Sequence, residues 1–254
     1  MIISTDMAWI VSVFLCFVRI SAALIMTPVF GGFSIPVNFR VLLMLALAAL
    51  LVSGGIANVS ALKLSAGVII EAAVAEFITG ILLAYGVFVA FAIFSFGGKL
   101  LDSQVGFGIG GLIDPVTRAP SPVLASAIDI FAIVFFFTAN IHHFLIKGLK
   151  YSFEMVPLGV GLRIESADLA LRQFGLVFIS GFSIAAPVIF LLLLIDIGLA
   201  VLSRNLPQFN VFMISVPIKI VAGLALLAAS LHLFFPLINK IFYTIPRYFE
   251  SLIG

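Results

Sequence analysis

Long apolar runs that carry charged side chains constrain this chain more than any other feature of its sequence. Six runs approach the roughly 20 residues that a helix needs to cross a bilayer, and they lie at about 7–27, 41–57, 66–96, 123–149, 174–202 and 211–235. Hydrophobic residues make up 63% of the chain and charged residues 9%, whereas soluble domains contain about 25% charged residues. The sequence therefore predicts an all-α integral membrane protein with about six apolar helical segments, forming one membrane domain over residues 1–254.

Six charged side chains lie inside these runs. They are Arg19, Glu71, Glu76, Asp129, Asp196 and Lys219. A charge at the centre of a bilayer costs roughly 2.5–3.5 kcal/mol on insertion scales, so a passive anchor has no reason to carry six of them. We therefore expect the segments to face protein or water rather than lipid, in a complex that transports something. We also expect the six charges to matter for the assembly of that complex.

Asp196 and Lys219 have a spacing that permits an ion pair. They flank a predicted turn at about 203–210, with Asp196 seven residues before it and Lys219 nine residues after it. In an antiparallel helical hairpin their depths differ by roughly 3 Å, at about 1.5 Å per residue. Either the two side chains pair with each other or each faces a different subunit, and the spacing permits both arrangements.

Residues 97–122 are dense in glycine and proline, and they contain a candidate gate. The residues of this candidate gate are Gly106, Phe107, Gly108, Ile109, Gly110, Gly111, Leu112, Asp114 and Pro115. The glycines formally match G-x-G-x-x-G, but a dinucleotide site needs a preceding strand and a following helix, and the flanks here are apolar helices. Non-helical backbone at membrane depth survives only where it is buried in protein or lines a cavity. The segment is therefore either a plug or constriction, or an ordinary flexible connector.

No arrangement of residues in the sequence supports catalysis or metal binding. Glu71 and Glu76 project about 140° apart on a helix, so they do not form a two-carboxylate acid–base site. Cys16 is the only cysteine, which excludes a disulfide framework, and the histidines lack metal-ligand spacing. The net charge of +2 is too small to indicate a nucleic-acid partner. We expect a protein that is not an enzyme and has no cofactor, no metal and no nucleic-acid partner.

Three stretches of the sequence, in this order, carry a resemblance to a known family. The first includes Arg19-Ile20-Ser21-Ala22, Pro28, Pro36 and Arg40; the second runs from Asp102-Ser103-Gln104-Val105-Gly106 to Asp114-Pro115; the third includes Pro207, Asn210, Phe212 and Pro217. Together they resemble the FliR/SctT/SpaR family of type III export-apparatus proteins over essentially the whole chain. The third stretch is the most specific of the three.

The resemblance implies a role, a location and a set of partners. A flagellar member of this family joins FliP and FliQ, with FlhB and FlhA as further partners, in the export gate of the bacterial inner membrane. This gate lies within the flagellar basal body and projects partly toward the periplasm. Its helices form bent hairpins in a helical multi-subunit assembly that passes unfolded export substrates, and the resemblance implies that the glycine-rich loop is the plug. An injectisome homologue of the SctT or SpaR type is the alternative that the resemblance leaves open.

The charged side chains alone leave a second class of function open. A proton-coupled small-molecule transporter uses acidic side chains inside its spans as a relay, and Glu71, Glu76 and Asp129 are the available ones. Such a transporter purifies alone or as a homo-oligomer. An export-gate subunit belongs instead to a large hetero-complex, so the two functions predict different behaviour on purification.

Overall fold

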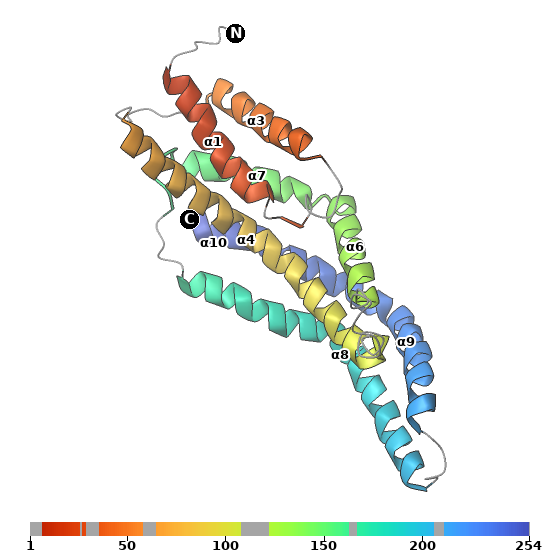
Figure 1. The fold of residues 1–254 in the computed structure, drawn as a ribbon. Coiled ribbons are helices and arrows are strands. Elements are labelled where there is room, and N and C mark those ends of the chain that lie inside the picture. Colours follow the sequence, from red (N-terminus) through yellow and green to blue (C-terminus); the bar gives the residue numbers. More distant parts are fainter. Residues whose placement is uncertain are drawn as a thin grey trace. The chain divides into compact units, whose positions relative to one another are not determined.

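The protein is built from helices throughout the part of the chain that the structure describes. The computed structural model describes residues 7–25, 27–28, 36–57, 65–107, 122–162, 167–205 and 211–253. Within these ranges every regular element is helical and no strand occurs (Figure 1). The helices are α1 (Met7–Ile25), α3 (Val37–Ser53), α4 (Ala66–Val105), α6 (Val123–Thr138), α7 (His142–Met155), α8 (Ala167–Asn205), α9 (Val211–Phe242) and α10 (Thr244–Ile253). The prediction of an all-α membrane protein is confirmed.

All six apolar runs form helices, but fewer than six are long enough to span a membrane. Within the described ranges, four helical stretches combine the required length and apolarity: Met7–Ile25, Ala66–Val105, Leu169–Asn205 and Met213–His232. A fifth is possible only if α6 and α7, which a short break separates, count together as one span. The run at 41–57 falls short because α3 has only 17 residues. The structure therefore describes four to five spans among about six apolar helical segments.

The two longest helices exceed what one bilayer crossing needs. Helix α4 has 40 residues and α8 has 39, so each is about 60 Å long at about 1.5 Å per residue, roughly twice the hydrocarbon thickness. The sequence places the end of the third run near residue 96, before Gly97 and Gly98. This boundary is wrong, because both glycines continue α4 and allow other helices to approach it. A Cβ atom on Gly98 would lie 2.5 Å from the Ala125 Cα, and one on Gly97 would lie 2.9 Å from the Gly181 carbonyl oxygen.

The chain forms two compact units. Unit 1 contains Met1–Val89, Ala139–Gln173 and Tyr243–Gly254, and unit 2 contains Ala90–Thr138 and Phe174–Phe242. Helices α4 and α8 contribute residues to both units, whereas each of the other helices belongs to one. Each unit has its own buried core, and the two are described separately below.

Unit 1 packs α1 against α3 and α10 against α7. Helix α1 can approach α4 closely because Gly80 has no side chain. A Cβ atom at this position would lie 2.5 Å from the Arg19 carbonyl oxygen. Helix α10 is anchored by Tyr248, which packs over Gly86 and donates a hydrogen bond of 2.9 Å to the Leu82 carbonyl oxygen. Glycines therefore mark the helix contacts of this unit, in agreement with the small-residue spacing common in membrane helix pairs.

Unit 2 is built around an apolar cluster and a group of phenylalanine rings. The cluster consists of Leu101, Val105, Leu124, Ala185, Val188 and Leu192, and all six side chains are buried. The phenylalanine group includes rings from α4, α6 and α9. The Phe242 ring stacks on the Phe135 ring at a centroid distance of 5.9 Å, and its centroid lies 5.2 Å from that of Phe94. Aromatic pairs of this kind stabilise a core beyond their buried area. The many phenylalanines of the sequence thus supply much of the core of unit 2.

Candidate functional site

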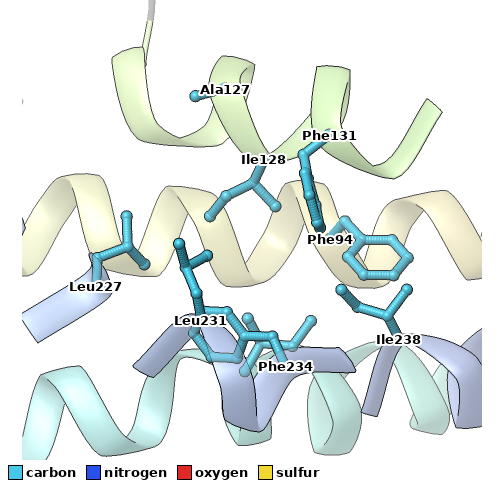
Figure 2. A pocket seen from close by; sticks show the side chains of 9 residues that line it. Phe94, Ala127, Ile128, Phe131, Leu227, Leu231, Phe234 and Ile238 are labelled. Carbon is cyan, nitrogen blue, oxygen red and sulfur yellow. The ribbon is translucent and has the colours of Figure 1, made fainter. Parts of the chain in front are cut away.

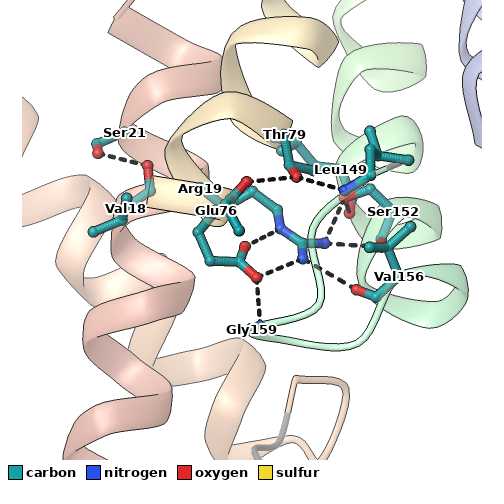
Figure 3. A network of polar contacts seen from close by, with 11 residues as sticks. Val18, Arg19, Ser21, Glu76, Thr79, Leu149, Ser152, Val156 and Gly159 are labelled. Carbon is teal, nitrogen blue, oxygen red and sulfur yellow. Dashed lines mark hydrogen bonds and ion pairs between the residues drawn. The ribbon is translucent and has the colours of Figure 1, made fainter. Parts of the chain in front are cut away.

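Two fully buried charges of unit 1 face each other. Arg19 of α1 and Glu76 of α4 are 0% exposed. The Arg19 guanidinium donates two parallel hydrogen bonds to the Glu76 carboxylate: one from Nε to Oε2, and one from Nη2 to Oε1 at 2.9 Å (Figure 3). Bidentate pairs of this type combine strength with geometric specificity. The sequence identifies both side chains as buried charges but does not pair them, because they lie 57 residues apart.

The remaining donors of Arg19 are satisfied by helix α7 and the residue that follows it. Nη1 donates to the Ser152 carbonyl oxygen at 2.9 Å and to the Ser152 hydroxyl at 3.4 Å, and Nη2 also donates to the Val156 carbonyl oxygen at 3.1 Å. The guanidinium carbon lies 4.5 Å from the centroid of the Phe153 ring. All five N–H groups of the guanidinium are therefore used. A buried charge is tolerated when it is paired and its remaining donors are satisfied, and Arg19 meets both conditions.

The turn after α7 is fixed to α4 by the same network. The Gly159 N–H donates to Glu76 Oε1 at 2.8 Å, and the Leu162 N–H donates to Thr79 Oγ1 at 3.2 Å. Gly159 and Gly161 have φ values of 88° and 69°, a region that favours glycine. A Cβ atom on Gly161 would lie 2.9 Å from the Ala75 side chain. Arg19 and Glu76 together thus hold α1, α7 and this turn on one face of α4.

Asp196 of α8 and Lys219 of α9 form an ion pair in unit 2. The Lys219 Nζ lies 2.7 Å from Asp196 Oδ1, and the two side chains are 21% and 39% exposed. Of the two arrangements that the sequence leaves open, the structure shows the pair within one chain. Arg19 and Glu76 are also paired. For the other two of the six charges named from the sequence, the described part of the chain shows no oppositely charged side chain at contact distance.

Those two are both acidic, and they lie in different units. Glu71 is exposed on α4, so it projects away from the buried Glu76, as their spacing predicts. Asp129 of α6 is half-buried, accepts a hydrogen bond from Ser95 and lies near Lys99. No local signal in the sequence marks Ser95 or Thr79, whose short hydroxyl side chains hydrogen-bond to Asp129 and to the Leu162 N–H.

The structure describes the first two residues of the candidate gate. Gly106 ends α4 with a φ of 99°, and its N–H donates to the Asp102 carbonyl oxygen at 3.2 Å. The Phe107 side chain packs against the apolar cluster of unit 2. The other candidate gate residues lie outside the described part of the chain: Gly108, Ile109, Gly110, Gly111, Leu112, Asp114 and Pro115.

Asp102 is a functional candidate that the sequence analysis named only as part of a motif. Its carboxylate is 5% exposed and accepts hydrogen bonds from the backbone N–H groups of Leu124 at 2.9 Å and Ala125 at 2.8 Å. One feature of the sequence could have pointed to Asp102. The fourth apolar run begins with Pro122 and Val123, and neither side chain can accept a hydrogen bond from the first N–H groups of the helix. An acid elsewhere in the chain was needed to supply the missing acceptor.

The residues of the family signature fall partly within the described ranges. Pro36 precedes α3 with a φ of −54°, and its carbonyl oxygen accepts hydrogen bonds from the N–H groups of Phe39 and Arg40. Pro217 lies inside α9. Pro28 is described, whereas Pro207 and Asn210 are not, and for Phe212 only the helical backbone is described.

An apolar cavity of about 180 Å³ lies in unit 2 among α4, α6, α8 and α9 (Figure 2). Its lining is Phe94, Ala127, Ile128, Phe131, Ile184, Leu227, Leu231, Phe234 and Ile238. None of these side chains can act as an acid, base or nucleophile. The cavity therefore suits an apolar group and offers nothing for chemistry.

The described ranges also contain no group of three or more His, Cys, Asp or Glu side chains arranged to hold a metal ion. Cys16 is buried in α1, and the rings of His142 and His143 lie 4.3 Å apart at the start of α7. Many polar side chains of this part of the chain hydrogen-bond within their own helix, and others join helices to one another and to turns. They do not converge on a place where a substrate would react.

Two ion pairs between long apolar helices, one fully buried and one partly exposed, define a polytopic membrane protein whose charges serve its architecture. Residues 10–245 match the model of the family described as "Bacterial export proteins, family 1". This match covers most of the chain, so the chain belongs to that family.

Individual relatives agree with this assignment. The chain is 30% identical to the "Flagellar biosynthetic protein FliR" of Bacillus subtilis over 232 residues, which cover 90% of this chain and 89% of the relative. It is 33% identical to the FliR of Escherichia coli over 183 residues, covering 72% and 70%. It is also 31% identical to the "Surface presentation of antigens protein SpaR" of Shigella flexneri over 144 residues, covering 57% and 56%.

Proposed function

We propose that the chain is a non-enzymatic subunit of the type III protein-export gate in the bacterial inner membrane, where it serves flagellum assembly. The observation that carries this proposal is the family match over residues 10–245. Relatives named for flagellar biosynthesis align along nearly the full length of both chains. The helical architecture, with charges buried between helices, supports a component of a transport assembly rather than a simple anchor.

The flagellar branch is favoured over the injectisome branch by the extent of the similarity. The relative from Bacillus subtilis covers 90% of this chain, whereas SpaR covers 57% at a comparable identity. A role in an injectisome remains the second candidate, because SpaR is also a type III export relative of this chain. The two branches differ in what a deletion of the gene would stop, so one experiment separates them.

The proton-coupled transporter is disfavoured by the state of Glu76. Its carboxylate accepts two hydrogen bonds from Arg19 and one from the Gly159 N–H. These three hydrogen bonds give the carboxylate a structural role, in which it joins α1 and the turn after α7 to α4. Glu71 is exposed and five residues away on α4, so the two carboxylates do not form a continuous path along the helix.

The partners that this function requires are FliP and FliQ, with FlhB and FlhA as further components of the apparatus. Support comes from the exposed apolar surface of unit 2: only 22% of the apolar window in Leu169–Asn205 and 11% of that in Met213–His232 is buried within the chain. The half-exposed pair of Asp196 and Lys219 lies on these two helices. We propose that partner subunits cover this surface, because a partly exposed ion pair is poorly suited to lipid.

We further propose that the glycine-rich segment beginning at Gly106 closes the channel at rest. Family resemblance supplies this role, and the positive φ of Gly106 supports a sharp change of chain direction at the end of α4. The apolar residues of the segment would exclude water from a narrow lumen. Its natural cargo would be unfolded flagellar export substrates passing through the assembled gate.

Deleting the gene in its own bacterium tests the proposed function. The deletion strain should lack flagella and should not secrete flagellar filament proteins, while the same proteins accumulate inside the cell. Supplying the gene on a plasmid should restore both. Normal swimming together with the loss of an injectisome secretion activity would assign the chain to the other branch. Normal flagella and normal secretion of all type III substrates would overturn the proposal.

A further inference from the structure

The apolar cavity of unit 2 has a buried inner end. Phe94 of α4, Ile184 of α8, and Phe234 and Ile238 of α9 line it, and all four side chains are buried. The helices thus leave a space of about 180 Å³ that their own side chains do not fill. Protein interiors contain few voids larger than a water molecule, and an empty one lowers stability. A space of this size therefore indicates an occupant.

Water is a poor occupant of this cavity. A buried water makes about 3 hydrogen bonds, and none of the 9 lining side chains carries a hydrogen-bonding atom. Asp129 of α6 is not among them, and its carboxylate accepts a hydrogen bond from Ser95. Apolar cavities of about 150 Å³ stay dry and bind small apolar molecules such as benzene. The chemistry of the lining therefore selects a hydrocarbon group.

The cavity opens to the surface between α6 and α9. Phe131 and Leu231 line it and are 37% and 45% exposed, and Figure 2 shows them, with Ile128, directed into the space between the two helices. The exposed neighbours of the opening are also apolar, and they are Ile130 and Val134 on α6 and Ala228 and Phe235 on α9. The apolar surface is therefore continuous from the outer face of these helices to the buried end of the cavity.

This opening lies away from the ion pair of Asp196 and Lys219. Leu231 follows Lys219 on α9 by 12 residues, which is about 18 Å at about 1.5 Å per residue. A partner subunit that docks at the ion pair therefore meets a different part of α9. The exposed residues named around the opening offer no charge or hydrogen bond that would select a protein partner. A hydrocarbon chain of the bilayer needs neither, and bilayer hydrocarbon is the medium of membrane helices.

We infer that this cavity binds one acyl chain of a membrane phospholipid, which enters between α6 and α9 and ends beside Phe94 and Phe234. The bound chain makes the apolar contacts that the four helices leave open, and it braces α6 against α9. A ligand that binds only the folded state stabilises that state, so unit 2 owes part of its stability to lipid. The inference rests on the membrane fold and does not depend on the proposed export role.

Brominated lipid reports whether an acyl chain reaches the buried end of the cavity. In the complex that the chain forms with FliP and FliQ, Trp9 and any tryptophan of the partners are replaced by Phe, and Phe234→Trp supplies the reporter. The complex is placed in vesicles of dioleoylphosphatidylcholine or of its dibrominated form, whose bromines quench tryptophan at contact distance. The reporter should lose most of its fluorescence in the brominated vesicles. Phe242→Trp, buried in the same unit but outside the cavity lining, should lose little.

Filling the cavity should exclude the lipid. Ile128→Phe adds a ring to the lining, and it should restore the fluorescence of the reporter in brominated vesicles. It should also reduce the rise of several degrees in melting temperature that added phospholipid gives to the delipidated complex. Ile130→Phe is the matched control, because Ile130 lies on the same helix, is exposed and does not line the cavity. Leu231→Phe, at the opening, replaces Ile128→Phe if that variant reduces the yield of complex.

The outcomes separate this inference from the proposed function. An unquenched Phe234→Trp reporter overturns the acyl-chain site. Quenching that persists unchanged in both Ile128→Phe and Leu231→Phe also overturns it, because the bromines then reach the reporter by another route. Quenching seen only without FliP and FliQ, although the complex forms, overturns it as well, since a partner side chain then fills the cavity. If no complex forms, the proposed function fails, and the same reporter in the chain alone still tests the cavity.

Discussion

Arg19 and Glu76 are separated by 57 residues in the sequence and form a bidentate ion pair in which both side chains are fully buried. The pair joins α1 to α4, and its remaining hydrogen bonds reach Ser152, Val156 and Gly159. One guanidinium and one carboxylate therefore connect α1, α4, α7 and the turn after α7 in the interior of unit 1. This arrangement explains how a charged side chain survives inside each of two apolar helices.

Replacing Glu76 by Gln should destabilise the protein strongly. The substitution leaves the Arg19 charge buried without its counterion, and breaking a buried pair in this way costs about 3–5 kcal/mol. Thermal unfolding of the purified complex, followed by native electrophoresis, measures the loss. Glu71→Gln is the matched control on the same helix, and it should unfold within a few degrees of the unchanged protein because Glu71 is exposed.

Removing both charges of this pair should be less harmful than removing one. Arg19→Met combined with Glu76→Leu takes away the stranded charge, and apolar replacements of buried pairs are often neutral or stabilising. The double variant should recover at least half of the stability that Glu76→Gln loses. A double variant as unstable as the single one would mean that the hydrogen bonds to the turn, rather than the ion pair, determine stability.

Asp196 and Lys219 should show a smaller coupling of the same kind. Lys219→Met should lower the yield of assembled complex, and adding Asp196→Asn should restore part of it. The side chains are 39% and 21% exposed, so a coupling free energy of about 1 kcal/mol is expected. Lys240→Met, which removes an exposed charge at the other end of α9, serves as the control. Strictly additive single effects would show that the contact does not contribute to assembly.

Two glycines of α4 should respond in opposite ways to the same substitution. A Cβ atom on Gly86 would lie 2.3 Å from the Tyr248 ring, whereas one on Gly67 meets nothing within 4 Å. Gly86→Ala should therefore destabilise unit 1 by about 1–3 kcal/mol through overpacking. Gly67→Ala should be neutral or stabilising by up to about 1 kcal/mol, since alanine favours the helix. Chemical or thermal unfolding of the two variants distinguishes them, and equal effects would contradict the helix contact at Tyr248.

Shortening the glycine-rich segment should affect closure and leave assembly intact. We expect that removing residues 108–112 gives a normal yield of complex but makes the membrane permeable to small ions and metabolites. Permeability is measured by the growth inhibition and ion leak of cells that produce the complex. A tight membrane together with normal export of flagellar proteins would identify the segment as a plain connector between α4 and α6.

The sequence was sufficient for the helical class, and for Asp196 and Lys219 it left two arrangements open, one of which is the pair that the structure shows. Asp196 and Lys219 flank one turn, so an antiparallel hairpin places them at similar depth. Arg19 and Glu76 have no such relation: their pairing depends on how α1 packs along α4, which the periodicity of either helix does not contain. A long-range contact of this kind is set by tertiary packing alone.

The role of individual glycines was the least predictable feature. Gly97 and Gly98 appear in the sequence as the beginning of a loop, yet both lie within α4 and permit contacts with Gly181 and Ala125. Gly106, nine residues after Gly97, does end the helix. Composition does not separate a glycine that admits a neighbouring helix from one that ends its own helix, because the difference lies in the neighbouring chain segment.

The composition of the complex tests the central proposal most directly. The chain, carrying an affinity tag, is produced together with the FliP and FliQ proteins of the same bacterium, extracted in mild detergent and separated by blue-native electrophoresis. The proposed function predicts one large complex that contains all three proteins, and a marked loss of this chain when FliP and FliQ are omitted. Recovery of a folded, monodisperse chain alone or as a homo-oligomer, with no association when the other two are present, would contradict it.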